Sequence, residues 1–281
     1  MPEQEAEAAA GPGTAGVPGV LRPDGAAGRF TLARRDPPDD LAPLLDWFWI
    51  VRWDVRGQPP YEQRILSHPN VHLVFEADGP RVYGVDTRVY TRRLTGEGKV
   101  LGIRFRAGCF RPFCSVPVAT LTDRVVPAAT FLGPTVDAAN EAIMAAAGDE
   151  EMIAGAVRLL RAAIPPRDPV AEEVASMVDS ITKGGEVRKV GELAGSFGMS
   201  ERRMQRLFAE YVGVSPKRVM RRARLHEAAL RADSGEAVDW RALASDLGYA
   251  DQAHLTRDFT ATIGTPPGRY LRRAAPPAAE T

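Results

Sequence analysis

The sequence predicts an α+β protein, with a β-rich N-terminal domain flanked by helices and an all-α C-terminal domain. Three observations predict this fold class. Apolar residues alternate with period two over much of 45–105, as in strands with one buried face. The proline-rich stretch 164–169 then breaks the chain and stiffens a linker. Beyond it the period-two runs vanish, and short amphipathic helices follow one another.

Composition sets outer limits on the class of protein. The chain has 281 residues, 36 basic and 36 acidic side chains and a formal net charge of zero. This length suggests two domains, and the apolar runs are too short to cross a membrane. No signal-peptide pattern opens the chain, and two cysteines cannot form a disulfide framework, so we expect a cytoplasmic protein. Taken alone, zero net charge argues against a nucleic-acid partner.

The order of segments follows from these patterns. Residues 1–40 hold seven acids against four bases and are rich in Gly, Pro and Ala, which predicts a disordered acidic arm over 1–28. We expect a β-rich domain with two C-terminal helices over 29–166, an all-α domain over 167–273 and a disordered tail over 274–281.

Within the β-rich domain, Trp47, Trp49, Val51, Trp53 and Val55 fall on one side of an extended chain. The sets Val71, Leu73, Phe75 and Ile103, Phe105 show the same period. Turn signals at 78–80 and 96–98 separate the runs, and helices are expected near 136–147 and 150–163. The tryptophan stripe fits either sheet core, a dimer face or an aromatic pocket. The candidates for an effector pocket are Trp47, Trp49, Trp53, His72 and Tyr83.

An internal repeat with an offset of 50 residues dominates the C-terminal domain. Leu193-Ala194 recurs as Leu243-Ala244, Gly198 as Gly248 and Phe208 as Phe259. The offset becomes 51 by the final glycine, where Gly213 recurs as Gly264. Each copy predicts a helix, a glycine turn, a second helix and a Gly-x-[Ser/Thr]-Pro stop. Residues 216–232 predict a longer helix between the copies.

The details of each copy favour a helix-turn-helix unit. Gly198 suits the left-handed end of the first helix, and Ser200 suits the N-cap of the second. Asp251 is the corresponding cap in the second copy. Helical spacing turns Met204, Leu207, Phe208 and Tyr211 inward and Arg202, Gln205, Arg206 and Ala209 outward; in the second copy Leu255 and Phe259 face inward, and Ala253, Thr256, Arg257 and Thr260 face outward.

The outward residue types suit the base edges of the DNA major groove. Arginine can bond guanine O6 and N7 together, glutamine can bond adenine, and the threonine methyl can meet the thymine methyl. Residues 200–225 hold eight bases against two acids, a local charge of +6 that the acidic arm offsets in the total. The neutral sum therefore does not exclude DNA, and the basic residues of 217–224 suit phosphates.

These motifs, from Leu193-Ala194 to Gly213-Val214-Ser215-Pro216 and from Leu243-Ala244 to Gly264-Thr265-Pro266, resemble the AraC family of bacterial transcription regulators. The resemblance covers about residues 170–273. It implies seven helices, with two helix-turn-helix units joined by a long helix. Its base-contacting positions fall on Arg202, Gln205, Arg206, Gln252, Ala253, His254, Thr256 and Arg257.

Two departures from the family pattern accompany this resemblance. Val219 stands where an aromatic residue often follows the first Ser-Pro, and Ala253 offers no side-chain hydrogen bond. The stretches 100–105 and 121–125 resemble β-rich domains that precede AraC-type modules in actinobacterial regulators. That resemblance implies a sensor or oligomerisation domain.

We therefore expect a sequence-specific transcription regulator and not an enzyme. Bases would be read by Arg202, Gln205, Arg206, Gln252, His254, Thr256 and Arg257, and phosphates held by Ser200, Arg203, Lys217, Arg218 and Arg222. The expected partners are duplex DNA with two adjacent half-sites, a small-molecule effector, a second copy of the chain and, for an activator, RNA polymerase. No membrane, cofactor, metal or catalytic residue is expected.

Two alternatives stay open. Cys109 and Cys114 flank Arg111, and a nearby cation can make a thiol reactive, so the module could be fused to a redox-sensing or alkyl-transfer domain. The chain could also bind DNA without control by a ligand. His68 and His72 are four residues apart, a zinc spacing on a helix, but the alternation around them indicates a strand, where they lie too far apart to share an ion.

Overall fold

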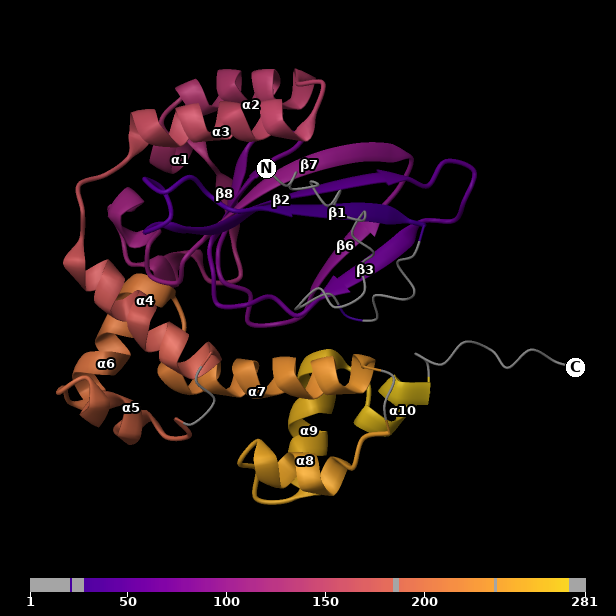
Figure 1. Ribbon diagram of the computed structural model, residues 1–281, viewed down its shortest axis with the longest axis vertical. Coiled ribbons are helices and arrows are strands. Elements are labelled where there is room, and N and C mark those ends of the chain that lie inside the picture. The colour runs from indigo at the N-terminus through magenta and orange to yellow at the C-terminus, as the bar shows by residue number, and fades with distance from the viewer. Residues whose placement is uncertain (1–20, 22–27, 184–186, 235–236, 273–281) are drawn as a thin grey trace, which may run out of the picture.

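The computed structural model describes residues 21, 28–183, 187–234 and 237–272. Apart from residues 21 and 28, the expected acidic arm lies outside the described residues, and so does the expected tail. The chain folds as predicted, with strands and flanking helices up to Ala163 and helices from Pro169 onward (Figure 1). Within the described part, no helix is both long and apolar enough to span a bilayer.

Two antiparallel sheets form the N-terminal domain. The larger sheet has six strands in the order β1-β2-β7-β4-β5-β8, and β3 and β6 form a separate pair. The bounds are β1 Phe30–Arg35, β2 Leu45–Asp54, β3 Tyr61–Ile65, β4 His72–Phe75, β5 Arg81–Tyr83, β6 Tyr90–Leu94, β7 Glu97–Phe105 and β8 Val125–Pro127.

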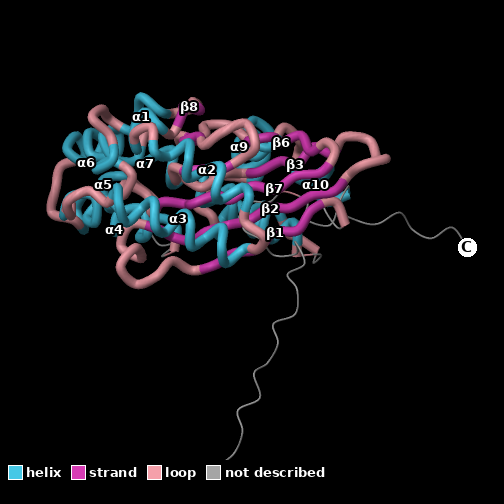
Figure 2. Tube along the Cα trace, turned by 90° about the horizontal axis from the view of Figure 1, so that it is seen from above, coloured by secondary structure: helices cyan, strands magenta, loops and turns pink. Residues whose placement is uncertain are grey.

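The large sheet buries one face under helices. Alternate residues of its central strands, such as Phe48, Leu73 and Ile103, are fully buried. They pack with residues of α1 (Ala129–Leu132), α2 (Thr135–Ala145) and α3 (Asp149–Ala163). Figure 2 shows α2 and α3 lying over the strands. Both long helices were predicted, because their apolar residues follow helical spacing.

The prediction of a turn at 96–98 is wrong for residues 97 and 98, which belong to β7. The turn occupies Thr95 and Gly96, while Gly98 lies inside β7 and pairs with Trp53 of β2. A Cβ atom on Gly98 would lie 2.4 Å from the Trp53 indole. This glycine therefore gives room to a ring rather than freedom to a turn.

Seven α-helices follow in the described C-terminal part, as the family resemblance implies. They are α4 Pro169–Thr182, α5 Val190–Ser196, α6 Glu201–Leu207, α7 Pro216–Asp233, α8 Trp240–Asp246, α9 Gln252–Ile263 and α10 Pro267–Arg272. A π-helical turn, Phe208–Val212, extends α6. The long α7 runs below the β-rich domain (Figure 1). It joins the first helix pair, α5 and α6, to the second helix pair, α8 and α9.

Apolar packing does not stop at the proline-rich linker. One continuous cluster of buried residues joins the sheet to the first helix pair, from Leu41 to Met220. A second cluster holds the other pair, and Leu66 of the β-rich domain belongs to it. Val219, the departure from the family pattern, is buried in the first cluster. The β-rich domain thus contributes to the cores of both helix pairs.

Candidate nucleic-acid interface and N-terminal cavity

The first helix pair has the geometry that the sequence predicts. Gly198 adopts φ +61° between α5 and α6, and the Ser200 side chain accepts a hydrogen bond from the Arg203 N–H. Met204 and Phe208 are fully buried on the inner side. Both the turn and the cap are local, so the sequence could specify them.

The outer side of α6 carries the predicted base-reading residues. Arg202, Gln205 and Arg206 are all exposed, as are Ser200 and Arg203, two of the expected phosphate contacts. Among the described residues, none forms an ion pair with Arg202, Arg203 or Arg206. The recognition stripe is thus open to solvent.

The second pair repeats this arrangement. Gly248 adopts φ +72°, and Asp251 caps α9 by accepting from the His254 N–H. Leu255 and Phe259 are fully buried. Toward solvent, Gln252, Ala253, His254 and Arg257 are exposed and Thr256 is half-buried. The His254 and Tyr249 rings meet edge to face, with ring centroids 5.1 Å apart.

The basic residues at 217–224 of α7 do not share one environment. Lys217 and Arg218 are exposed. Arg221 pairs with Asp258 of α9 at 3.0 Å, and the Arg224 guanidinium lies 5.4 Å from the Tyr249 ring centroid. These two side chains tie α7 to the second helix pair, so the basic stripe predicted over 217–224 is not a single DNA-facing surface.

Arg222 corrects one predicted phosphate contact. Its side chain is only 7% exposed and donates to the backbone carbonyls of Asp86 and Arg88 at 2.9 and 3.4 Å. Burial lowers the pKa of this guanidinium to about 10, so it remains charged. The prediction that Arg222 holds phosphate is wrong in this arrangement, because the β-rich domain covers it.

The β-rich domain also contacts the C-terminal ends of two corresponding helices, α6 with its π-helical extension and α9. The Thr122 hydroxyl donates to the Gly213 carbonyl at 2.7 Å, just after the π-helical turn. The Arg64 guanidinium donates to the Ile263 carbonyl at the end of α9. These are corresponding ends of the two repeats. One domain therefore fixes both helix pairs relative to each other.

The second face of the large sheet lines a cavity of about 200 Å³, which β3 and β6 also border. All five residues predicted for a pocket line it: Trp47, Trp49, Trp53, His72 and Tyr83. The Trp49 indole lies over Gly102, whose Cβ would sit 1.9 Å from the ring, and it donates to His72 Nδ1 at 3.1 Å. The tryptophan stripe is thus a cavity wall.

Apart from His72 and Tyr83, sequence reasoning did not assign the polar residues of this cavity. Arg34 of β1 and Arg104 of β7 line it together with His68, Asn70 and Glu76. The alternation Phe30, Leu32, Arg34 along β1 was a usable signal, since all three point to the cavity side. Arg104 could not be placed, because its neighbours come from distant strands.

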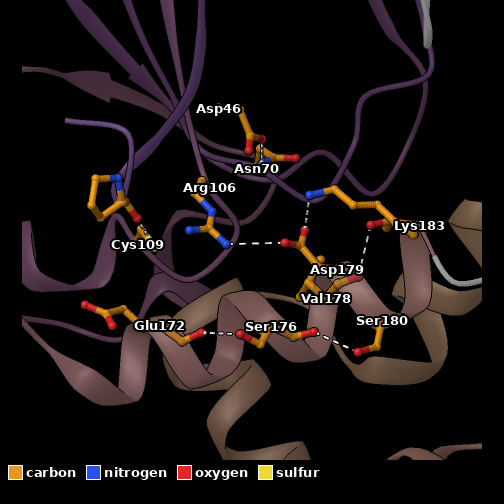
Figure 3. A network of polar contacts seen from close by, with 12 residues as sticks. Asp46, Asn70, Arg106, Cys109, Glu172, Ser176, Val178, Asp179, Ser180 and Lys183 are labelled. Atoms are coloured by element: carbon orange, nitrogen blue, oxygen red, sulfur yellow. Dashed lines mark hydrogen bonds and ion pairs between the residues drawn. The ribbon is translucent and has the colours of Figure 1, made fainter. Parts of the chain in front are cut away.

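Both cysteines are buried free thiols. Cys109 is fully buried, and its thiol donates to the Pro43 carbonyl at 3.5 Å, beside the Arg106–Asp179 ion pair (Figure 3). Cys114 donates to the Phe110 carbonyl. Burial raises the pKa of each thiol to about 12, so the reactive thiolate is disfavoured.

Two family models match parts of the chain. Residues 193–273 match the family "Helix-turn-helix domain", and residues 33–127 match a domain of unknown function (DUF6597). No curated protein matches the chain.

Several solved structures are similar to parts of the chain. An AraC-type regulator from Chromobacterium violaceum is 18% identical over 40% of this chain and 100% of its own, with a TM-score of 0.35. A probable AraC family regulator from Rhodopseudomonas palustris is 26% identical over 37% of this chain and 97% of its own, with a TM-score of 0.34. ToxT from Vibrio cholerae is 11% identical over 88% of this chain and 98% of its own, with a TM-score of 0.36.

Two helix-turn-helix units on a rigid linking helix, behind a β-rich domain, define a DNA-binding transcription regulator. The kind of helix-turn-helix domain follows from its tandem motifs and from the family model that matches it. The protein carries an AraC-type helix-turn-helix domain at residues 193–273.

Proposed function

We propose that this regulator recognises a bipartite operator by inserting α6 and α9 into successive major grooves on one face of DNA. The main observation behind this proposal is that both repeats bury one side of these helices and expose corresponding side chains on the other. Successive grooves lie about 34 Å apart, so two rigidly joined helices can read them together.

In this proposal the exposed side chains have separate roles. Arg202, Gln205 and Arg206 read bases from α6, and Gln252, His254, Thr256 and Arg257 read bases from α9. Ser200, Arg203, Lys217 and Arg218 hold phosphates and fix the register. Because Ala253 lacks a hydrogen-bonding side chain, α9 reads fewer base pairs than its length would permit.

The β-rich domain acts as a sensor through its cavity and as the site of dimerisation. An effector bound there shifts the population of DNA-competent arrangements, since this domain contacts both helix pairs. The protein works in the cytoplasm by binding rather than catalysis, and contacts RNA polymerase where it activates. Buried thiols with raised pKa values do not favour the alkyl-transfer and redox alternatives.

The direct test selects binding sites for the full-length protein from a random DNA library. The expected result is two short motifs with centres one helical turn apart. Footprinting on the selected duplex should then protect two adjacent major grooves. A library recovered without sequence enrichment would instead identify an architectural DNA binder and refute the proposal.

A further inference from the structure

The cavity has a chemical gradient that follows from strand register. At one end, Trp47 on β2 pairs with Arg104 on β7, which in turn pairs with His72 on β4. At the other end, Phe30 on β1 pairs with Trp53, which pairs with Gly98. The cavity therefore runs from a cationic end to an apolar one, where Leu94 of β6 packs beside Phe30.

The cationic end holds two guanidiniums around one indole. The Cζ atoms of Arg34 and Arg104 lie 4.7 and 4.1 Å from the Trp47 ring centroid. Arg104 also pairs with Asp46 at 2.9 Å. Arg34 has no acidic partner among the described residues, and its buried Nε lacks a hydrogen-bond acceptor. Asp46 thus pairs with Arg104, while no carboxylate among the described residues pairs with Arg34.

The other charged groups around the cavity already have ionic or hydrogen-bonding partners. Glu76 is 7% exposed at its side chain and lies 2.9 Å from Arg92 and 3.7 Å from Arg81, while the Tyr83 hydroxyl donates to it at 2.8 Å. Asp86 accepts from the Ser67 hydroxyl. Burial, followed by the charge of Arg104, lowers the pKa of His72 to about 3, so that ring adds no positive charge. Arg34 is therefore the lining arginine that has no acidic partner among the described residues.

The apolar part of the cavity has a flat wall. Glycines at 98 and 102 let the indoles of Trp53 and Trp49 lie over β7, where any Cβ would collide with them. Leu32, Val51 and Val100 continue this wall between the two ends. Planar rings stack well on such aromatic surfaces.

We propose that the cavity binds a small monoanion with a flat apolar body, such as an aromatic carboxylate. The carboxylate is held by Arg34 and Arg104, and the ring lies against Trp49 and Trp53. A carboxylate suits the planar guanidinium fork and neutralises the Arg34 cation. Binding itself is independent of DNA recognition; its regulatory meaning rests on the proposed function.

The same cavity wall touches the linking helix. His68 lines the cavity, and its ring stacks on His226 of α7 with centroids 3.8 Å apart. Asp86 also lines the cavity, and its carbonyl accepts from Arg222 of α7. A ligand that shifts either loop therefore acts on the helix that spaces the two recognition units.

The test measures binding of 2-naphthoate to the full-length protein by calorimetry and by tryptophan fluorescence, since three of the four tryptophans line the cavity. The neutral probe is 2-naphthalenemethanol, and the flexible anionic probe is decanoate. We expect 2-naphthoate to bind at least about tenfold more tightly than either, as one charge-assisted contact and one stacked ring would provide.

The matched variants are Arg34→Gln and Arg35→Gln, because Arg35 is the exposed neighbour on the opposite side of β1. Arg34→Gln should weaken 2-naphthoate binding roughly tenfold and leave the neutral probe unchanged, whereas Arg35→Gln should change neither. Arg34→Lys keeps the charge and should retain most of the affinity, which separates binding from damage to the fold.

Equal affinity for the neutral probe, equal effects of the two glutamine variants, or no binding of 2-naphthoate would each overturn the inference. Tighter binding of decanoate would overturn the flat-body part of it. If 2-naphthoate binds as expected but leaves operator affinity unchanged, the effector role in the proposed function fails while the binding site stands.

Discussion

The imidazoles of His68 and His226 stack with their planes only 10° apart, and they join the cavity loop of one domain to the linking helix of the other. Neither ring was assigned a role by the sequence pattern. The contact is made at the interface where Arg222 also crosses from α7.

Folding stability should fall as pH drops below about 6.5. Burial, followed by the charge of Arg222, lowers the pKa of His226 in the folded chain to about 3, against an ordinary value of 6.5. Between these values the unfolded chain binds a proton that the folded chain does not, so acid favours unfolding. Urea midpoints at pH 7.5, 6.5 and 5.5 should fall less steeply for His226→Gln than for the natural chain. Parallel slopes would contradict the assignment.

Arg222→Met should destabilise the protein without removing a phosphate contact. It leaves the carbonyls of Asp86 and Arg88 without their buried donor, at a cost of roughly 1–3 kcal/mol. Thermal melts should show the loss, while the salt dependence of DNA binding stays as in the natural chain. A salt slope that becomes shallower by about one unit would mean that Arg222 reaches phosphate after all.

Arg206→Ala should relax sequence preference. Losing a bidentate base contact should cost about 1–3 kcal/mol on the selected operator and little on random DNA. Arg218→Ala is the matched control, since its exposed side chain is assigned to phosphate. That variant should weaken all duplexes alike and make the salt slope shallower by about one unit. Equal losses on operator and random DNA for Arg206→Ala would remove it from base readout.

Gly102→Ala should destabilise the β-rich domain, because its new Cβ would lie 1.9 Å from the Trp49 ring. Overpacking of this kind costs about 1–3 kcal/mol. Gly195→Ala, in α5, is the opposite case: nothing lies within 4 Å of the new atom, and alanine should add about 0.5–1 kcal/mol of stability. Urea unfolding of both variants measures the difference. If Gly102→Ala were as stable as Gly195→Ala, the indole would not lie as described.

Some of these features were predictable because they depend on nearby residues alone. The left-handed turns at Gly198 and Gly248 and the caps at Ser200 and Asp251 arise within a few residues of chain. The same pattern of turn and cap occurs in both copies of the repeat, which strengthened the prediction. For the same reason the exposed sides of α6 and α9 could be listed residue by residue.

The assignment of Arg222 to phosphate failed for the opposite reason. The sequence shows five basic residues in 217–224, and helical spacing alone cannot separate their roles. Only the contacts with Asp258, Tyr249 and the Asp86 carbonyl divide them. Each of these partners comes from a different segment.

The sequence by itself therefore determined the class of protein, the two recognition helices and the tryptophan stripe. Tertiary structure decided that the stripe is a cavity wall, that Arg34 and Arg104 both lie against the Trp47 ring, and that Arg222 is buried. The physical reason is range: turns, caps and helix faces depend on neighbours in the chain, whereas the surroundings of a charge depend on which distant strands and helices pack against it.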